Sequence, residues 1–212
     1  MRTELAFGRP WETIIRRAHT SGAEMVVIGG HNRRKFGAIF LSSTASRLLR
    51  RGNLPVLNAN AVATSLYRRP EIAVDLEKTS VKVLETPLWV LQSEVPYAAV
   101  LHAYEVLFEG FGFPALSAKE LADYREDART NARSSLLNLL GAFDGARCVL
   151  QPILRRGDPR RVIPREGASR KADLLVLGTH GRAALSRSML GSVAEWIVRA
   201  ARRDVLMARP SR

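Results

Sequence analysis

Three glycines and a serine at fixed spacing are the residues of this sequence that best fit a chemical task. Gly178 is followed after two residues by Gly181, and after nine more by Gly191 and Ser192. Glycine lets the backbone come close to a ligand and adopts positive φ without strain. A helix starting at Gly191 would add unpaired N–H groups and the positive end of its dipole. The spacing therefore predicts a loop that binds phosphate groups.

The sequence around these glycines supports that interpretation. The apolar run 174–177 precedes Gly178 and is typical of a strand buried on both faces. After Gly191, apolar residues at positions 193, 196, 197 and 200 fall on one face of a helix. A tight turn followed by an ordinary helix start would use the same residues. The position between strand and helix favours ligand binding over that alternative.

An internal repeat organises the chain. Residues 8–57 align without a gap with residues 157–206, and 15 of the 50 pairs are identical. Gly29 aligns with Gly178 and His31 with His180, so each copy has its own loop after a buried strand. A repeat of this length indicates a duplicated structural unit. Each unit is predicted to run helix, strand, loop, helix, strand.

The chain in front of the second unit completes an α/β domain. Apolar runs predict strands at residues 71–75, 97–103 and 147–154. A helix is predicted from residue 80 to about 93, shortened or kinked by Pro87. A capping-box pattern at Ser117 and Glu120 opens a long helix through Leu139. With strands at 174–177 and 204–207, the result is a five-stranded, doubly wound parallel sheet, preceded by a partial second copy of the same fold.

The repeat and the predicted elements divide the chain into three parts. Residues 1–58 are a partial, degenerate half domain, 59–69 a linker, and 70–212 the complete domain. The first copy lacks its first two strands, so the strand at 25–28 would leave an apolar edge open. Another chain, a rearrangement within this one, or a preceding segment would have to cover that edge. The strands at 55–57 and 205–207 are candidates to pair within one chain, in imitation of a dimer.

The loop and its flanks resemble a known family. Residues 172–182, followed by residues 191–195, are similar to the universal stress protein family, whose ATP-binding branch carries G-x2-G-x9-G-(S/T), and the match here is complete. The stretches 101–103 and 157–159 and the residue Asp75 also resemble family positions. Leu76 and Glu77 depart from the family, which more often has a small residue and a serine there. The resemblance implies a Rossmann-like sheet of order 3-2-1-4-5.

The resemblance also implies a ligand and roles for residues. The ligand is ATP or another adenine nucleotide, with Mg²⁺ or Mn²⁺ on its phosphates, in a regulatory or signalling protein of the stress response. Asp75 and the backbone at Ala103 would hold the adenine and ribose end, and Gly178 would approach the ribose. The remaining residues assigned to the nucleotide site are those of the phosphate end, Thr179, His180, Gly181, Arg182, Gly191, Ser192 and Val193.

The first copy is predicted to bind ATP poorly. Asn32 stands in place of Gly181, and Ser42 in place of Gly191. Asparagine tolerates left-handed geometry, so Asn32 is the milder change. Ser42 puts a side chain where a phosphate would press on the helix start. The predicted site is thus confined to the C-terminal domain.

The composition limits which classes of partner and which cellular compartment are expected. The net charge is +13, and 28 of the 33 basic residues are arginines, yet aromatic residues make up only 7% of the chain. Spread over solvated faces, these arginines argue against a nucleic-acid partner. A single cysteine, the lack of a signal-peptide core and the lack of an apolar run of about 18 residues predict a cytoplasmic protein without a membrane partner.

Three functions remain open from the sequence. The first is a nucleotide-binding regulatory protein that forms a homo-oligomer or an intrachain pseudo-dimer. The second is a nucleotide hydrolase or transferase on the same fold, although no Walker A lysine or paired carboxylates flank the loop. The third is an interaction module that binds anionic partners through its arginines.

Overall fold

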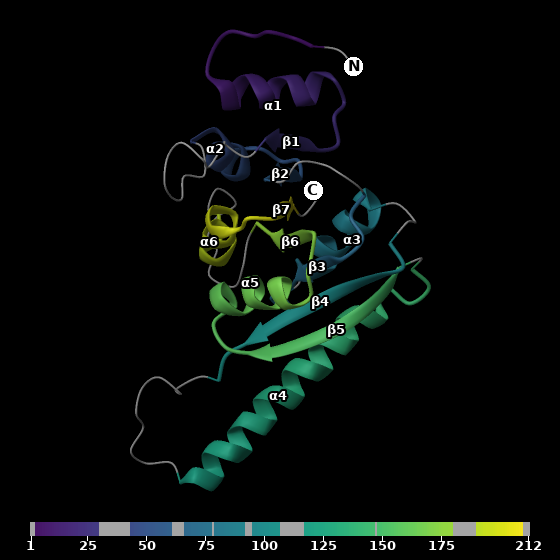
Figure 1. Cartoon of the computed structure of the whole chain (residues 1–212), viewed down its shortest axis with the longest axis vertical. Helices are drawn as coiled ribbons and strands as arrows, with labels where there is room; N and C mark the ends of the chain where they lie inside the picture. Colours follow the sequence, from purple (N-terminus) through teal and green to yellow (C-terminus); the bar gives the residue numbers. More distant parts are fainter. Residues whose placement is uncertain are drawn as a thin grey trace.

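A computed structural model describes residues 3–29, 43–60, 66–77, 79–91, 95–106, 117–146, 148–179 and 190–209. The protein has a mixed α/β fold built on a single seven-stranded sheet, and all strand pairs but one are parallel. The strand order is β1-β2-β7-β6-β3-β4-β5 (Figure 1). No helix in the described ranges is both long and apolar enough to cross a bilayer.

The strands begin and end close to the predicted apolar runs. They are β1 Val26–Gly29, β2 Val56–Ala59, β3 Pro70–Ala73, β4 Tyr97–Tyr104, β5 Val149–Arg156, β6 Leu174–Gly178 and β7 Asp204–Ala208. The largest shift is in β5, which starts and ends two residues later than the prediction. The predicted five strands and the two strands of the first copy form one continuous sheet rather than separate sheets.

Helices connect the strands. They are α1 Pro10–Thr20, α2 Ser43–Arg51, α3 Ser80–Val90, α4 Ala118–Gly141, α5 Pro159–Ser169 and α6 Ser192–Ala200. The capping box of α4 is formed as predicted: the Ser117 side chain accepts from the Glu120 N–H, and the Glu120 carboxylate accepts from the Ser117 N–H. Pro87 lies inside α3, which ends three residues later.

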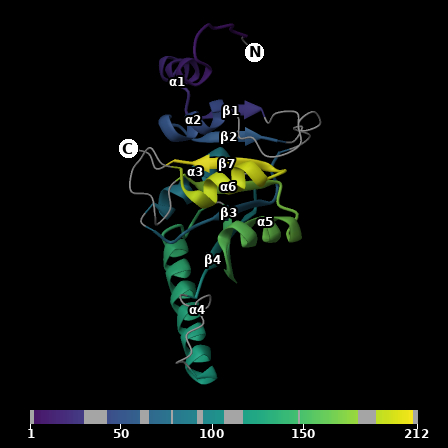
Figure 2. The ribbon, with the colours of Figure 1, turned by 90° about the vertical axis from the view of Figure 1, so that its left-hand side faces the viewer.

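The two faces of the sheet carry two hydrophobic cores. Alternate residues of β6 belong to opposite cores, Leu175 to one and Val176 to the other. The first core packs under α5 and α6 and includes Leu49 of α2, and the second packs under α3 and the C-terminal part of α4. Figure 1 shows α6 on one side of the strands and α3 on the other, and Figure 2 shows α6 in front of the sheet and α4 projecting beyond it. Because β6 is buried on both faces, its sequence is continuously apolar.

An antiparallel strand pair joins the two units. β2 and β7 pair with Val56 opposite Met207 and Leu57 opposite Leu206. This is the intrachain pairing that the sequence left open. Beside the junction, Arg50 of α2 lies 3.4 Å from the carboxylate of Glu195 in α6. β1 forms the end of the sheet, next to β2.

A buried carboxylate fastens the chain that follows β2. Asp204, at the start of β7, accepts hydrogen bonds from the Asn60 N–H (2.7 Å) and from the Tyr67 hydroxyl (2.6 Å). Burial, followed by the hydrogen bond to Asp204, raises the pKa of Tyr67. The residues predicted as a linker are thus held against β7 at both ends of their undescribed stretch.

Removal of the Tyr67 hydroxyl should weaken this attachment. Tyr67→Phe is expected to lower the free energy of unfolding by about 1.5 kcal/mol, because a hydrogen bond to a charged group is lost. Urea denaturation measures the loss. Tyr97→Phe is the matched control, since the Tyr97 ring is 37% exposed, and should change stability by less than about 0.5 kcal/mol. Equal losses in the two variants would contradict a specific role for the Tyr67–Asp204 bond.

Candidate functional site

The predicted phosphate loop begins and ends at one point on the carboxyl edge of the sheet. β6 ends at Gly178, and the next residue, Thr179, is fully buried. The Thr179 N–H donates to the Ala208 carbonyl of β7 at 3.2 Å. The Thr179 carbonyl accepts from the Gly191 N–H at 2.9 Å. The second bond holds the exit of β6 and the entry of α6 together, and the first ties this point to β7.

The start of α6 presents backbone donors beside this closure. Gly191 is the N-cap residue, with φ −59° and ψ 142°, and as a glycine it has no side chain to cap the helix. The Gly191 carbonyl accepts the first helical bond, from the Glu195 N–H. The N–H groups of Ser192 and Val193 belong to the first turn, where an α-helix has no internal acceptors. An anion placed there gains these donors and the helix dipole.

The loop lies where the connections of the sheet reverse. β3 is the neighbour of both β4 and β6, with Ala73 opposite Leu101 on one side and opposite Leu177 on the other. From β3 the chain proceeds to β4 in one direction, whereas β6 and β7 continue the sheet in the other. In open α/β sheets, such a switch point leaves a crevice at the carboxyl ends of the strands, where ligands bind.

The residues predicted for the adenine end lie at the carboxyl ends of β3 and β4, on the same edge of the sheet. Asp75 follows β3, and its Oδ1 accepts from the Glu77 N–H (3.1 Å) and the Ser80 hydroxyl (2.8 Å), which shapes the turn into α3. Leu76 has φ +63°, a left-handed conformation that is strained for a branched side chain. This geometry gives a physical reason why a small residue suits that position better.

The second residue predicted for the adenine end, Ala103, lies near the end of β4. The register between β3 and β4 stops at Leu101, so the backbone of Ala103 lies beyond it on that side. His102 is buried, and its Nδ1 lies 2.8 Å from the Val74 carbonyl. This buried contact fits the interpretation of His102 as a core histidine rather than a ligand. Ala103 is half-buried and keeps its pairing with β5 through Arg155.

The structure thus brings together part of the predicted set. Gly178, Thr179, Gly191, Ser192 and Val193 lie where β6 ends and α6 begins, Asp75 follows β3, and Ala103 lies near the end of the neighbouring β4. The predicted site residues at positions 180, 181 and 182 lie outside the described residues, as do positions 32 and 42 of the first copy.

Sequence reasoning missed a buried carboxyl group in the central strand. Glu71 of β3 is 1% exposed, and within the described residues neither of its oxygens has a hydrogen-bond partner. Its Oε1 lies 3.5 Å from where a Cβ on Gly167 of α5 would stand. Burial, and next the charge of Glu166, raises the pKa of Glu71 to about 7, against the opposing effect of nearby arginines. The sequence did contain a signal for this buried carboxyl group, because Glu71 lies in a strand predicted at the centre of the sheet. A strand with neighbours on both sides and helices on both faces has no solvated position for a glutamate.

Comparison with known proteins places these features in context. Residues 2–58 and 67–209 match the model of the universal stress protein family. A universal stress protein of Mycobacterium tuberculosis is 28% identical over 217 residues, which cover 100% of this chain and 70% of the relative. Universal stress protein E of Escherichia coli is 26% identical, over 95% of this chain and 66% of the relative.

Solved structures share the fold. A functionally unknown protein from Pseudomonas aeruginosa PAO1 superposes with a TM-score of 0.67 at 21% identity, covering 97% of this chain and 69% of that one. A universal stress protein from Archaeoglobus fulgidus gives a TM-score of 0.64 at 18% identity, covering 95% and 66%. At these identities the likeness concerns the fold alone.

Proposed function

Because the chain belongs to the universal stress protein family, we propose that it binds ATP or another adenine nucleotide at the carboxyl edge of β3 and β6, as a regulatory or signalling protein of the stress response. One observation carries this proposal. The loop after β6 is closed by the bond between the Gly191 N–H and the Thr179 carbonyl, so that the uncapped start of α6 stands at the switch point of the sheet.

The described residues suggest how the ligand would be held. The N–H groups of Ser192 and Val193, with the Ser192 hydroxyl, would receive the terminal phosphates. Gly178 and Gly191 would let the ribose and phosphates approach the backbone. Thr179 is buried with both backbone groups engaged, so its role would be to hold the loop. Magnesium or manganese would neutralise the phosphates, with ligands supplied largely by the nucleotide.

The adenine and ribose would lie on the other side of the crevice, against Asp75 and the backbone of Ala103. Asp75 Oδ1 accepts two hydrogen bonds in the turn into α3, and these bonds would hold the carboxylate in position for the ligand. Loop positions 180–182 would complete the phosphate end. The two matches to the family model support a tandem organisation, in which the second unit carries the site and the first unit packs against it through β2.

The proposal is tested by the effect of ATP with Mg²⁺ on thermal stability. A ligand present at about 100 times its Kd should add about 2.7 kcal/mol to the free energy of unfolding. We expect a concentration-dependent rise in melting temperature with ATP, and a smaller one with GTP. No rise at millimolar ATP would overturn nucleotide binding, and equal rises with ATP and GTP would contradict the adenine assignment.

A further inference from the structure

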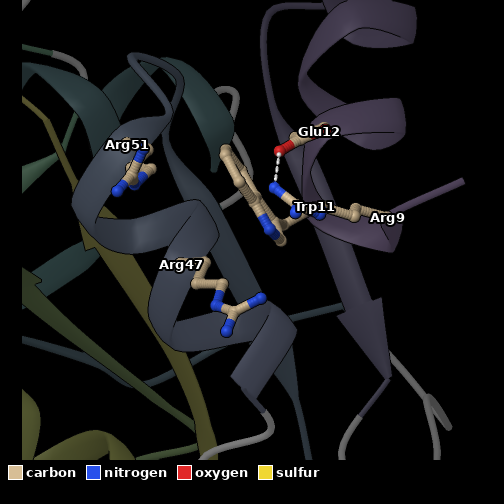
Figure 3. Close-up of a pocket in the computed structure, with 5 residues that line it drawn as sticks. All are labelled: Arg9, Trp11, Glu12, Arg47 and Arg51. Atoms are coloured by element: carbon tan, nitrogen blue, oxygen red, sulfur yellow. Dashed lines mark hydrogen bonds and ion pairs between the residues drawn. The ribbon is translucent and has the colours of Figure 1, made fainter.

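Three arginines and a tryptophan line a cavity in the first unit. The cavity has a volume of about 470 Å³ and lies between α1 and α2, lined by Arg9, Trp11, Glu12, Arg47 and Arg51 (Figure 3). None of these residues belongs to the proposed nucleotide site. From this cluster we infer that the cavity binds a small phosphoryl or pyrophosphoryl anion.

The charge of the lining is strongly positive. Three guanidinium groups face one carboxylate, that of Glu12, which pairs with Arg9 at 3.1 Å. Arg51 stacks over the ring of Trp11, with its Cζ 5.1 Å from the ring centre. Within the described residues, Arg47 has no carboxylate partner. Planar guanidinium groups bind phosphate oxygens in pairs, so arginines gathered in this way favour an oxyanion.

A buried donor also points to a missing acceptor. The indole Nε1 of Trp11 is shielded from solvent, and in the described part of the chain no group accepts its hydrogen. A buried N–H without an acceptor costs free energy. Figure 3 draws this nitrogen on the edge of the ring toward Arg47, whose side chain is exposed. An oxyanion drawn in by Arg47 would supply the acceptor.

The repeat shows that this helix start differs from its counterpart. In the second unit, α5 is capped by Asp158, whose carboxylate accepts from the Arg160 N–H at 2.9 Å. The equivalent N-cap of α1 is Arg9, whose side chain makes no capping hydrogen bond. A built-in anion in one copy is thus replaced by a cation in the other. An external anion at the start of α1 would satisfy both the helix N–H groups and Arg9.

A single-tryptophan variant of the full chain tests the inference. Trp89→Phe with Trp196→Phe leaves Trp11 as the only tryptophan, and both replaced rings are at least 42% exposed. Sodium pyrophosphate is titrated at about 20 mM salt, where screening is weak. We expect a saturable change in Trp11 emission. Its midpoint should rise roughly tenfold in Arg47→Gln and in Arg9→Gln, because each variant removes a charge-assisted hydrogen bond.

Control variants distinguish binding in this cavity from nonspecific attraction to positive charge and from binding at the proposed nucleotide site. Arg16→Gln removes an exposed arginine of the same helix that does not line the cavity, and should move the midpoint by less than about twofold. Gly191→Val, added to the reporter, should leave the Trp11 response unchanged. The inference is overturned if Trp11 shows no saturable response up to about 10 mM pyrophosphate, or if Arg16→Gln weakens the response as much as Arg47→Gln.

Discussion

Gly191→Val is expected to abolish the stabilisation of the chain by ATP. Without ligand, the variant should fold, because φ −59° and ψ 142° are open to any residue, and only about 1 kcal/mol of N-cap preference is lost. With ligand, the valine side chain would occupy the position of a phosphate at the start of α6. The gain of about 2.7 kcal/mol at 100 times Kd should therefore fall to near zero in thermal denaturation.

Two further variants make this result specific. Gly191→Ser introduces the residue that the first copy has at the equivalent position, and serine is a good N-cap, so unliganded stability should be kept while the ATP effect is lost. Gly29→Ala changes the glycine equivalent to Gly178 in the first copy, where an added Cβ meets nothing within 4 Å. That control should retain the full ATP effect. A full ATP effect in both Gly191 variants would show that no phosphate lies against this residue.

Glu71→Gln is expected to stabilise the protein in a pH-dependent manner. In the folded chain the pKa of Glu71 is raised to about 7 from an ordinary value of 4.5. Between these values the native state binds more protons than the unfolded chain does, so stability falls as pH rises. The contribution of the protonated carboxyl is complete below about pH 4.5 and is lost as pH passes 7. Glutamine stays neutral, so the variant should gain roughly 3 kcal/mol at pH 8 and little at pH 5.

Urea denaturation at several pH values measures this effect. Glu71→Met, which is apolar and similar in size, should show the same pH dependence without a buried amide that needs partners. Glu126→Gln is the control, since that carboxylate is exposed on α4, and its curve should run parallel to that of the wild type. Parallel curves for Glu71→Gln and the wild type would mean that Glu71 is ionised in the native state across this range.

The groups around Glu71 explain why its pKa is raised. Glu166 of α5 adds a second negative charge, and its own partner is Arg155, with Nε 3.0 Å from Oε1. Arg170, Arg203 and Arg155 lower the pKa of Glu71, but no described residue donates a hydrogen bond to the carboxylate. Burial has the largest effect on the pKa of Glu71, because an ionised carboxylate without a partner in the protein interior costs free energy.

Much of the fold could be predicted because its strands carry simple patterns. The continuous apolar run of β6 and the Ser117 capping box each define an element by local chemistry alone. The ends of β5 could not be predicted, since its polar and charged residues at Gln151, Arg155 and Arg156 lie within the strand. The single seven-stranded sheet depends on the β2–β7 pairing, which joins segments far apart in the chain.

The site was predictable to the extent that it depends on glycine spacing. Gly178 and Gly191 lie at the two ends of the loop, but the sequence did not indicate that the Thr179 backbone closes it. Arg9 and Arg47 are far apart in the sequence, so only the packing of α1 against α2 brings them to one cavity. The one signal of this cavity in the sequence is in the repeat, where Arg9 stands at the position equivalent to Asp158.

The antiparallel junction of β2 and β7 also determines how the molecule responds to dilution. Its two sides belong to the same chain, and residues 60–69 connect one of them to the rest. A tether of this length imposes an effective concentration on the order of millimolar, far above that of a typical protein solution. Formation of the junction is therefore a first-order step of folding. It should persist at concentrations where an equal interface between two free subunits would dissociate.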